Sequence, residues 1–169
     1  MGTGKSSVGR SVAAQLKFDF IDTDDLIEQR AGCRISDIFE QEGEARFRNY
    51  ESEVVRGLES VRGAVIATGG GLVMNPDNMV SLKKHAIVVC LWARPAIIWQ
   101  RVRHQSHRPL LHHPDPLVRI RELLEERGPA YRAANVLVNT DLRSLPETIH
   151  HVLHHYRIAT QNTKLSRHS

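Results

Sequence analysis

The chain has 169 residues, of which 41% are apolar and 25% are charged, a balance typical of one compact domain with a buried core. Its formal net charge is +4 at pH 7, but Lys and Arg are spread along the sequence and only 5% of residues are aromatic, which argues against a nucleic-acid partner. We expect no membrane partner and a cytoplasmic location, because there is no signal peptide, no apolar run of about 18 residues, and no CxxC spacing between Cys33 and Cys90.

The first residues, MGTGKSS, match the second half of a phosphate-binding loop that runs into a helix. Gly4, Lys5 and Ser6 end the pattern GxxxxGK[ST], in which backbone N–H groups cradle phosphates, the Lys reaches the terminal phosphates and the hydroxyl meets Mg²⁺. Apolar residues after Ser6 recur on one helical face, so a helix N-terminus should face the anion; this disfavours the alternative of a flexible glycine-rich tail. The expected ATP-binding residues here are Gly2, Thr3, Gly4, Lys5, Ser6 and Ser7.

The opening Gly of that pattern, and the apolar strand that usually feeds such a loop, would lie before Met1. We expect Met1 to be an internal residue of the natural protein, and the reading frame to continue upstream through a Val/Ile/Leu-rich strand.

Acidic residues follow the first predicted strand, Phe18–Asp22. Thr23, Asp24 and Asp25 can cap the next helix. Ligands of open parallel α/β sheets bind at the carboxyl ends of strands, so Asp22 and Asp24 are also placed for chemistry. The alternative that one of them only caps the helix stays open.

A second predicted strand, 64–68, breaks directly into Gly69-Gly70-Gly71. Before it, the periodicity predicts a short helix near 35–40 and a longer one from about 44 to 60, with Arg46 and Arg48 at its start. Three glycines allow a backbone to approach a ligand closely, although a flexible turn is the alternative.

The second half of the chain continues to alternate helix and strand. We expect a helix from Asn75-Pro76 to His85, a strand over 86–92 and a helix over 95–103. The polar, Pro-broken stretch at about 104–115 is then typical of a mobile lid, with Arg108 reaching inward over phosphates. An ordinary connecting loop is the alternative.

The last predicted elements are a helix over 117–134, interrupted by Gly128-Pro129, a strand over 136–139 and a final helix from Leu145. Its histidine pairs at i,i+4 spacing point away from the apolar face, which favours a solvated surface over a metal site. We expect one α/β domain over 1–158, with three layers around a parallel sheet, and a disordered tail over 159–169.

Taken in order, six motifs closely resemble the shikimate kinases. They are GTGKS, Asp22-Thr23-Asp24, Phe47-Arg48-x-x-Glu51, Gly69-Gly70-Gly71, Arg108-Pro-Leu-Leu and Arg127-x-Pro-x-Tyr131. The resemblance implies a nucleoside-monophosphate-kinase-like fold with a mobile lid and strand order 2-3-1-4-5, of which strand 1 is absent here. It also implies transfer of the ATP γ-phosphoryl group to the 3-hydroxyl of shikimate, a step of aromatic amino-acid biosynthesis.

By matching position, the resemblance assigns Lys5 to the β- and γ-phosphates, and Ser6 and Asp22 to Mg²⁺, the latter through the metal's waters. Asp24 matches the carboxylate that contacts the shikimate hydroxyls and is the candidate base. Lys5, Asp24 and Arg108, the lid arginine, are the catalytic set.

The same matching assigns substrate binding to Arg48, Arg127 and the Gly69–Gly71 backbone. The two arginines suit a carboxylate because a planar guanidinium can bind it bidentately. Arg101 and the loop that starts at Arg143 match the family's adenine-side contacts. ATP and shikimate are the expected partners of a monomer; another small-metabolite kinase, such as a gluconate kinase, and a non-catalytic nucleotide-binding remnant are the alternatives.

Overall fold

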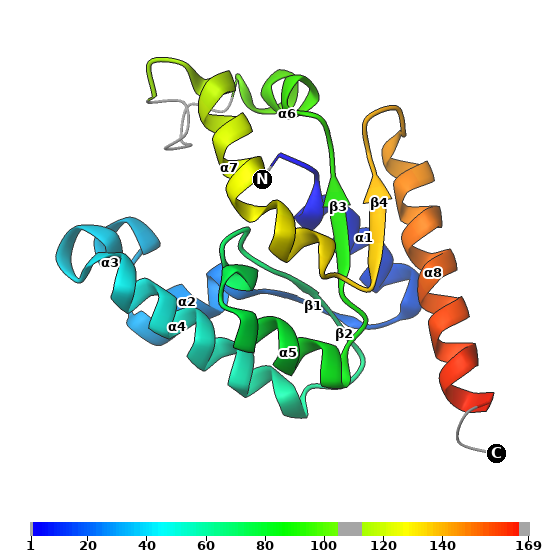
Figure 1. The fold of residues 1–169 in the computed structure, drawn as a ribbon. Coiled ribbons are helices and arrows are strands. Elements are labelled where there is room, and N and C mark those ends of the chain that lie inside the picture. The colour runs from blue at the N-terminus through cyan, green and yellow to red at the C-terminus, as the bar shows by residue number, and fades with distance from the viewer. Residues whose placement is uncertain (1, 105–112, 166–169) are drawn as a thin grey trace. The chain divides into compact units, whose positions relative to one another are not determined.

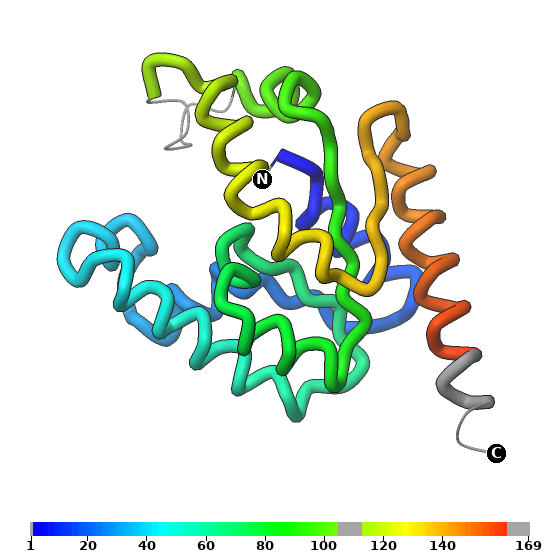
Figure 2. The backbone as a smooth tube through the Cα atoms, viewed as in Figure 1, coloured from blue at the N-terminus to red at the C-terminus, as the bar shows by residue number. Residues whose placement is uncertain are grey.

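The computed structural model describes residues 2–104 and 113–165 (Figure 1). Most of the predicted lid, Arg108 included, lies outside these residues. The chain divides into two compact units, one made of Ser6–Ala86 and the other of Met1–Lys5 with Ile87–Ser169. Figure 2 follows the same backbone as a tube, and the chain passes from the second unit to the first at the start of helix α1.

The Ser6–Ala86 unit is built on two parallel strands, β1 (Asp19–Asp22) and β2 (Ala64–Ala67). Asp22 is paired with Ala67, so both strands end at the same edge. The segments that follow them, which carry Asp24 and Gly69, therefore leave the sheet side by side, as the sequence predicts for the carboxyl end of a parallel sheet.

Helices complete this unit. They are α1 (Lys5–Leu16), α2 (Thr23–Ala31), α3 (Ile35–Gln41), α4 (Gly43–Gly57) and α5 (Pro76–His85), with the short 3₁₀ turns η1 (Leu58–Ser60) and η2 (Leu72–Met74). A Cβ on Gly9 of α1 would lie 2.8 Å from the Phe20 ring, so this glycine allows the helix to approach β1 closely. Elsewhere α2, α3 and α4 pack against one another, and each contributes buried apolar side chains, among them Ile27, Ile38 and Phe47.

The second unit also contains a parallel pair, β3 (Val89–Trp92) and β4 (Val136–Asn139). Its helices are α6 (Pro95–Val102), α7 (Pro116–Arg132) and α8 (Leu145–Leu165). Helix α6 packs against α7, and α8 packs against β4. The buried cluster at the first of these contacts consists of Ala93, Ile98, Val102 and Ile120.

Alternation of strands and helices confirms the predicted α/β class, and both strand pairs are parallel as expected. In the expected order 2-3-1-4-5, β1 and β2 correspond to strands 2 and 3, and β3 and β4 correspond to strands 4 and 5. The order of strands across the two pairs stays a prediction, as does a single domain over 1–158. Among the described residues, no helix is both long enough and apolar enough to cross a membrane.

Two details of the predicted helices are wrong. Helix α7 is not interrupted at Gly128-Pro129 but runs through Pro129 to Arg132; a proline removes only its own backbone N–H donor from a helix, and here that loss does not end it. Helix α8 does not end near Ile158 but continues to Leu165, since the residues in between include no Gly or Pro that would stop it.

Candidate active site

The N-terminal segment has the backbone geometry of a phosphate loop. Gly2 and Gly4 have φ of 61° and 85°, in the left-handed region that favours glycine, and α1 begins directly at Lys5. A Cβ on Gly2 would lie 2.7 Å from Val102 Cγ1 and 3.1 Å from Ile98 Cγ2, so the loop packs closely on α6. The helix start leaves its first backbone N–H groups without intrahelical partners, which is the arrangement that binds phosphate oxygens.

A hydroxyl and a carboxylate meet where α1 and β1 come together. Ser6 Oγ donates to Asp22 Oδ2 at 3.2 Å, and Asp22 Oδ1 accepts from the Asp24 backbone N–H at 3.2 Å. Asp22 is thus both the N-cap of α2 and the partner of Ser6. One hydroxyl with one carboxylate fits Mg²⁺, which keeps several waters and takes its other ligands from substrate phosphates. In the described parts of the chain no group of three or more His, Cys, Asp or Glu could hold a metal.

Asp24 lies directly against the triple glycine. The Gly69 backbone N–H donates to Thr23 Oγ1 at 3.1 Å, and the Thr23 side chain is fully buried. A Cβ on Gly69 would lie 2.8 Å from Asp24 Oδ1 and 3.5 Å from Glu51 Oε1. A larger residue at this position would displace Asp24, so the glycine is required by the packing of these carboxylates and is more than a flexible turn.

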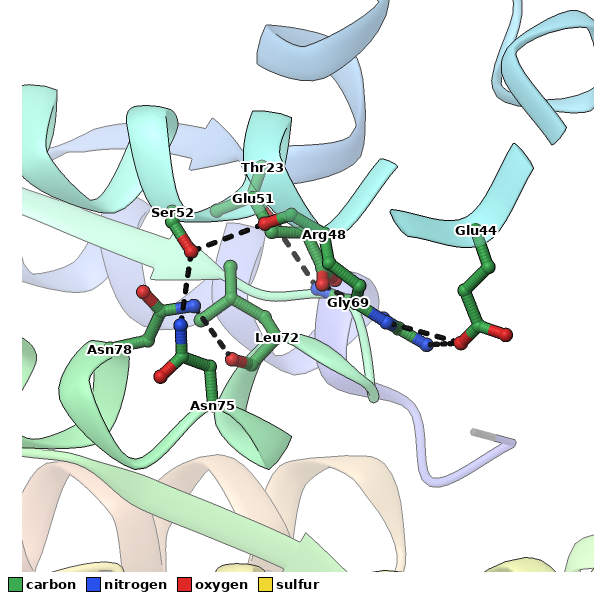
Figure 3. Close-up of polar contacts among 9 residues, drawn as sticks. All are labelled: Thr23, Glu44, Arg48, Glu51, Ser52, Gly69, Leu72, Asn75 and Asn78. Carbon is green, nitrogen blue, oxygen red and sulfur yellow. Dashed lines mark hydrogen bonds and ion pairs between the residues drawn. The ribbon is translucent and has the colours of Figure 1, made fainter. Parts of the chain in front are cut away.

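Two carboxylates on its own helix hold Arg48 beside the same glycines (Figure 3). Its Nη1 donates to Glu51 Oε2 at 2.8 Å and its Nη2 to Glu44 Oε1 at 2.7 Å. A Cβ on Gly71 would collide with the guanidinium, whose Cζ is 3.0 Å away. Burial lowers the pKa of Arg48, but the hydrogen bonds to Glu51 and Glu44 outweigh it and raise the pKa above its ordinary value.

Glu51 is a functional candidate that the sequence analysis used only as part of a motif. Its side chain is 2% exposed, and it forms an ion pair with Arg48. Charged groups are rarely buried this far without a partner. The signal in the sequence is the i,i+3 spacing from Arg48 on α4, which places both side chains on one face of the helix.

Side-chain amides fix the segment that follows the glycines (Figure 3). Asn78 Nδ2 donates to the Leu72 carbonyl at 3.0 Å, and Asn75 Nδ2 donates to Ser52 Oγ at 3.2 Å. Ser52 Oγ in turn donates to the Arg48 carbonyl at 3.1 Å. These bonds tie η2 and the start of α5 to α4, so the glycine segment and Arg48 share one support.

In the other unit, three arginines form hydrogen bonds at the end of β4 and in the loop that follows it. Arg101 Nη1 donates to Thr140 Oγ1 at 2.8 Å, and Arg143 donates to the Asn139 carbonyl. Arg94, which the sequence analysis did not single out, donates from its backbone N–H and from Nε to Asp141 at 2.7 and 2.6 Å. The two arginines predicted for the adenine side therefore belong to one local structure.

Arg127 lies on α7 of this unit and forms a hydrogen bond to the phenol of Tyr131. Burial raises the pKa of Tyr131, and the bond from Arg127 only partly offsets this effect. The Nε atom of Arg127 is buried and has no hydrogen-bond partner among the residues that the structure describes.

Comparison with known proteins decides the family. The family model for shikimate kinase matches residues 1–157. A shikimate kinase of Caldanaerobacter subterraneus is 45% identical over 156 residues, covering 92% of this chain and 91% of the relative, and that of Thermus thermophilus is 44% identical over 154 residues, covering 90% and 84%. The chain belongs to the shikimate kinase family.

Solved structures of this family have the same fold. A shikimate kinase from Acinetobacter baumannii in complex with shikimate matches with a TM-score of 0.85 and 36% identity, over 96% of this chain and 89% of that one. A gluconokinase from Sinorhizobium meliloti matches with a TM-score of 0.65 over 98% and 92%, but at 19% identity this likeness shows the fold alone.

Site residues predicted for this shikimate kinase family member fall in both units. The Ser6–Ala86 unit contains Ser6, Ser7, Asp22, Asp24, Arg48 and Gly69–Gly71; the other contains Gly2–Lys5, Arg101, Arg127 and Arg143. Within the first unit the structure brings together Ser6 with Asp22, and Asp24 and Arg48 with the glycines. Within the second it brings Arg101 and Arg143 to one loop.

Proposed function

We propose that this chain transfers the γ-phosphoryl group of ATP to the 3-hydroxyl of shikimate, giving shikimate 3-phosphate and ADP. Membership of the shikimate kinase family supports an ATP-dependent kinase. The observation that carries the acceptor assignment is the cluster of Asp24, Arg48 and the Gly69–Gly71 backbone at the end of β1 and β2. In this cluster the Asp24 carboxylate can bind hydroxyl groups of the substrate, and the Arg48 guanidinium can bind its carboxylate.

On the donor side, the phosphate loop binds the triphosphate of ATP. Backbone N–H groups at the start of α1 contact the phosphate oxygens, and Lys5 holds the β- and γ-phosphates. Ser6 and Asp22 would hold Mg²⁺, which when bound supplies positive charge to the β- and γ-oxygens. Arg101 and Arg143 bind the adenine side, and Arg108 adds positive charge at the transferred group.

On the acceptor side, Asp24 orients the 3-hydroxyl of shikimate and takes its proton. A bond forms between that oxygen and the γ-phosphorus, and the bond from the γ-phosphorus to the bridging oxygen of ADP breaks. Arg48 and Arg127 bind the shikimate carboxylate, and the Gly69–Gly71 backbone lies against the ring hydroxyls. Glu51 orients Arg48. A monomer in the cytoplasm is part of the same proposal.

Turnover with two acceptors tests the proposal. The purified chain is incubated with ATP, MgCl₂ and either shikimate or gluconate; ADP is followed by a coupled assay and the phosphorylated product by mass spectrometry. We expect ADP and shikimate 3-phosphate in equal amounts, and no product from gluconate. Product from gluconate instead would assign the chain to the rival kinase class, and ATP binding without turnover of either acceptor would assign it to a non-catalytic nucleotide-binding protein.

A further inference from the structure

On α7, Arg127 forms a hydrogen bond to the phenol of Tyr131. Substrate binding by Arg127 does not by itself explain this hydrogen bond. We propose that Tyr131 is a positioning residue: its phenol holds one edge of the Arg127 guanidinium, so that the edge containing Nε is presented to the carboxylate of the acceptor substrate. This inference rests on the proposed function, since it assigns the support of one of its binding residues.

Helix geometry makes Tyr131 the available side-chain partner on α7. The residues one turn away from Arg127 are Leu123, Leu124, Ala130 and Tyr131, and side chains at these spacings are the ones that meet on a helix surface. Among those four, Tyr131 alone has a polar side chain. Burial raises the pKa of Tyr131, so at neutral pH it stays an uncharged phenol that accepts from the guanidinium without neutralising it.

The Nε atom of Arg127 supplies the second observation. It is buried, and no residue in the described parts of the chain accepts from it. A buried donor on a charged group is costly when it has no partner. A carboxylate binds the Nε edge of a guanidinium with two parallel hydrogen bonds, which is the ligand chemistry that would satisfy this atom.

An internal comparison shows that pairing with a tyrosine does not by itself leave Nε without a partner. Arg46 and Tyr50 on α4 have the same i,i+4 spacing, and Arg46 Nη2 donates to the Tyr50 hydroxyl at 3.3 Å. There, however, Nε donates to Glu42 at 3.2 Å, and Nη1 lies 3.8 Å from Glu53. Arg46 is therefore satisfied within its own unit, whereas Nε of Arg127 has no partner among the residues that the structure describes.

The test compares Tyr131→Phe with Tyr50→Phe in the full chain. Each change removes one phenol from an arginine and keeps the ring. For Tyr131→Phe we expect the Kd and KM for shikimate to rise about 3- to 10-fold, as for the loss of one hydrogen bond that orients a charged group. The Kd for ADP and kcat at saturating shikimate should change less than about twofold. Tyr50→Phe should leave all four values within about twofold.

A double-mutant cycle excludes a purely structural effect. Once Arg127→Ala has removed the guanidinium, adding Tyr131→Phe should not weaken shikimate binding further, because the phenol acts through Arg127. Additive losses in the cycle would overturn the proposal. So would a Tyr131→Phe variant that has an unchanged melting temperature and either an unchanged Kd for shikimate or an equal loss of affinity for ADP. If the unmodified chain neither bound nor phosphorylated shikimate, the proposed function would fail instead, and the two failures are thus distinguishable.

Discussion

Arg48 and Arg127, which we assign to the same substrate carboxylate, are held in opposite ways in their two units. Arg48 forms ion pairs with Glu44 and with the buried Glu51, whereas Arg127 forms its hydrogen bond to a neutral phenol and has a buried Nε without a partner in the described residues. Carboxylate partners fix orientation but offset charge; a phenol fixes orientation and leaves the charge available. We therefore expect Arg48 to contribute mainly orientation and Arg127 mainly attraction.

The largest effect is expected from a change at Asp24. It tests whether the Ser6–Ala86 unit contains the catalytic base in addition to the substrate-binding Arg48. Asp24→Asn keeps the size of the side chain but removes the base, so turnover should fall by roughly 100-fold or more, while ADP affinity and the melting temperature stay close to those of the unmodified chain. Steady-state kinetics with a thermal unfolding curve checks this. Near-normal turnover would remove Asp24 from the mechanism.

Arg48→Lys tests the orienting role directly. Lysine keeps the charge but cannot form the bidentate pair. Loss of a charge-assisted hydrogen bond is worth about 1.5–3 kcal/mol, so shikimate Kd should rise roughly 10- to 100-fold. Calorimetric titration with shikimate, and with ADP as the control ligand, measures it. A change confined to ADP would contradict the assignment.

Glu51→Gln should weaken shikimate binding less and destabilise the fold more. The amide preserves the shape but leaves Arg48 beside a neutral partner in a site where Glu51 is 2% exposed. A loss of about 2 kcal/mol would lower the melting temperature of a chain this size by roughly 4–8 °C. We also expect a shikimate Kd about 3- to 10-fold higher. An unchanged melting temperature together with unchanged affinity would show that Glu51 does not support Arg48.

Glu44→Gln is the matched control for Glu51→Gln, and we expect it to have the smallest effect on melting temperature and shikimate affinity. Glu44 pairs with the same arginine at 2.7 Å, but its side chain is 66% exposed. Exposed ion pairs contribute about 0–1 kcal/mol, so melting temperature and shikimate affinity should stay close to those of the unmodified chain. If the two variants behaved alike, burial of Glu51 would not be what distinguishes the two acids.

Several parts of the candidate site could be predicted from local pattern. The phosphate loop is one, because its glycines and the following helix are adjacent in sequence, and the structure gives Gly2 and Gly4 the left-handed backbone that such a loop needs. Asp22 is another, since a carboxylate after a strand can cap a helix and face the sheet edge at once; the structure shows it bonded to both Asp24 and Ser6. The roles of these residues in ATP and shikimate binding stay predictions.

Where the sequence-based expectations failed, single local signals were given too much weight. Gly128-Pro129 is a helix-breaking dipeptide, yet α7 continues to Arg132. The polar composition after Ile158 is typical of a disordered tail, yet α8 runs to Leu165. Composition measures the average tendency of a segment, whereas a helix ends only where its hydrogen bonds cannot continue.

Order and spacing along the chain were enough to predict the family, the α/β class and the residue types of the site. Tertiary structure alone decided how those residues are held. The i,i+3 and i,i+4 spacings are visible in the sequence, but they do not say that Glu51 is buried against Arg48 and that Gly69 lies against Asp24. Nor do they say that Arg46 is satisfied by its neighbours while Nε of Arg127 has no partner in the described chain. Burial and hydrogen-bond satisfaction depend on which segments, distant in sequence, pack around a side chain, and that is settled only when the chain has folded.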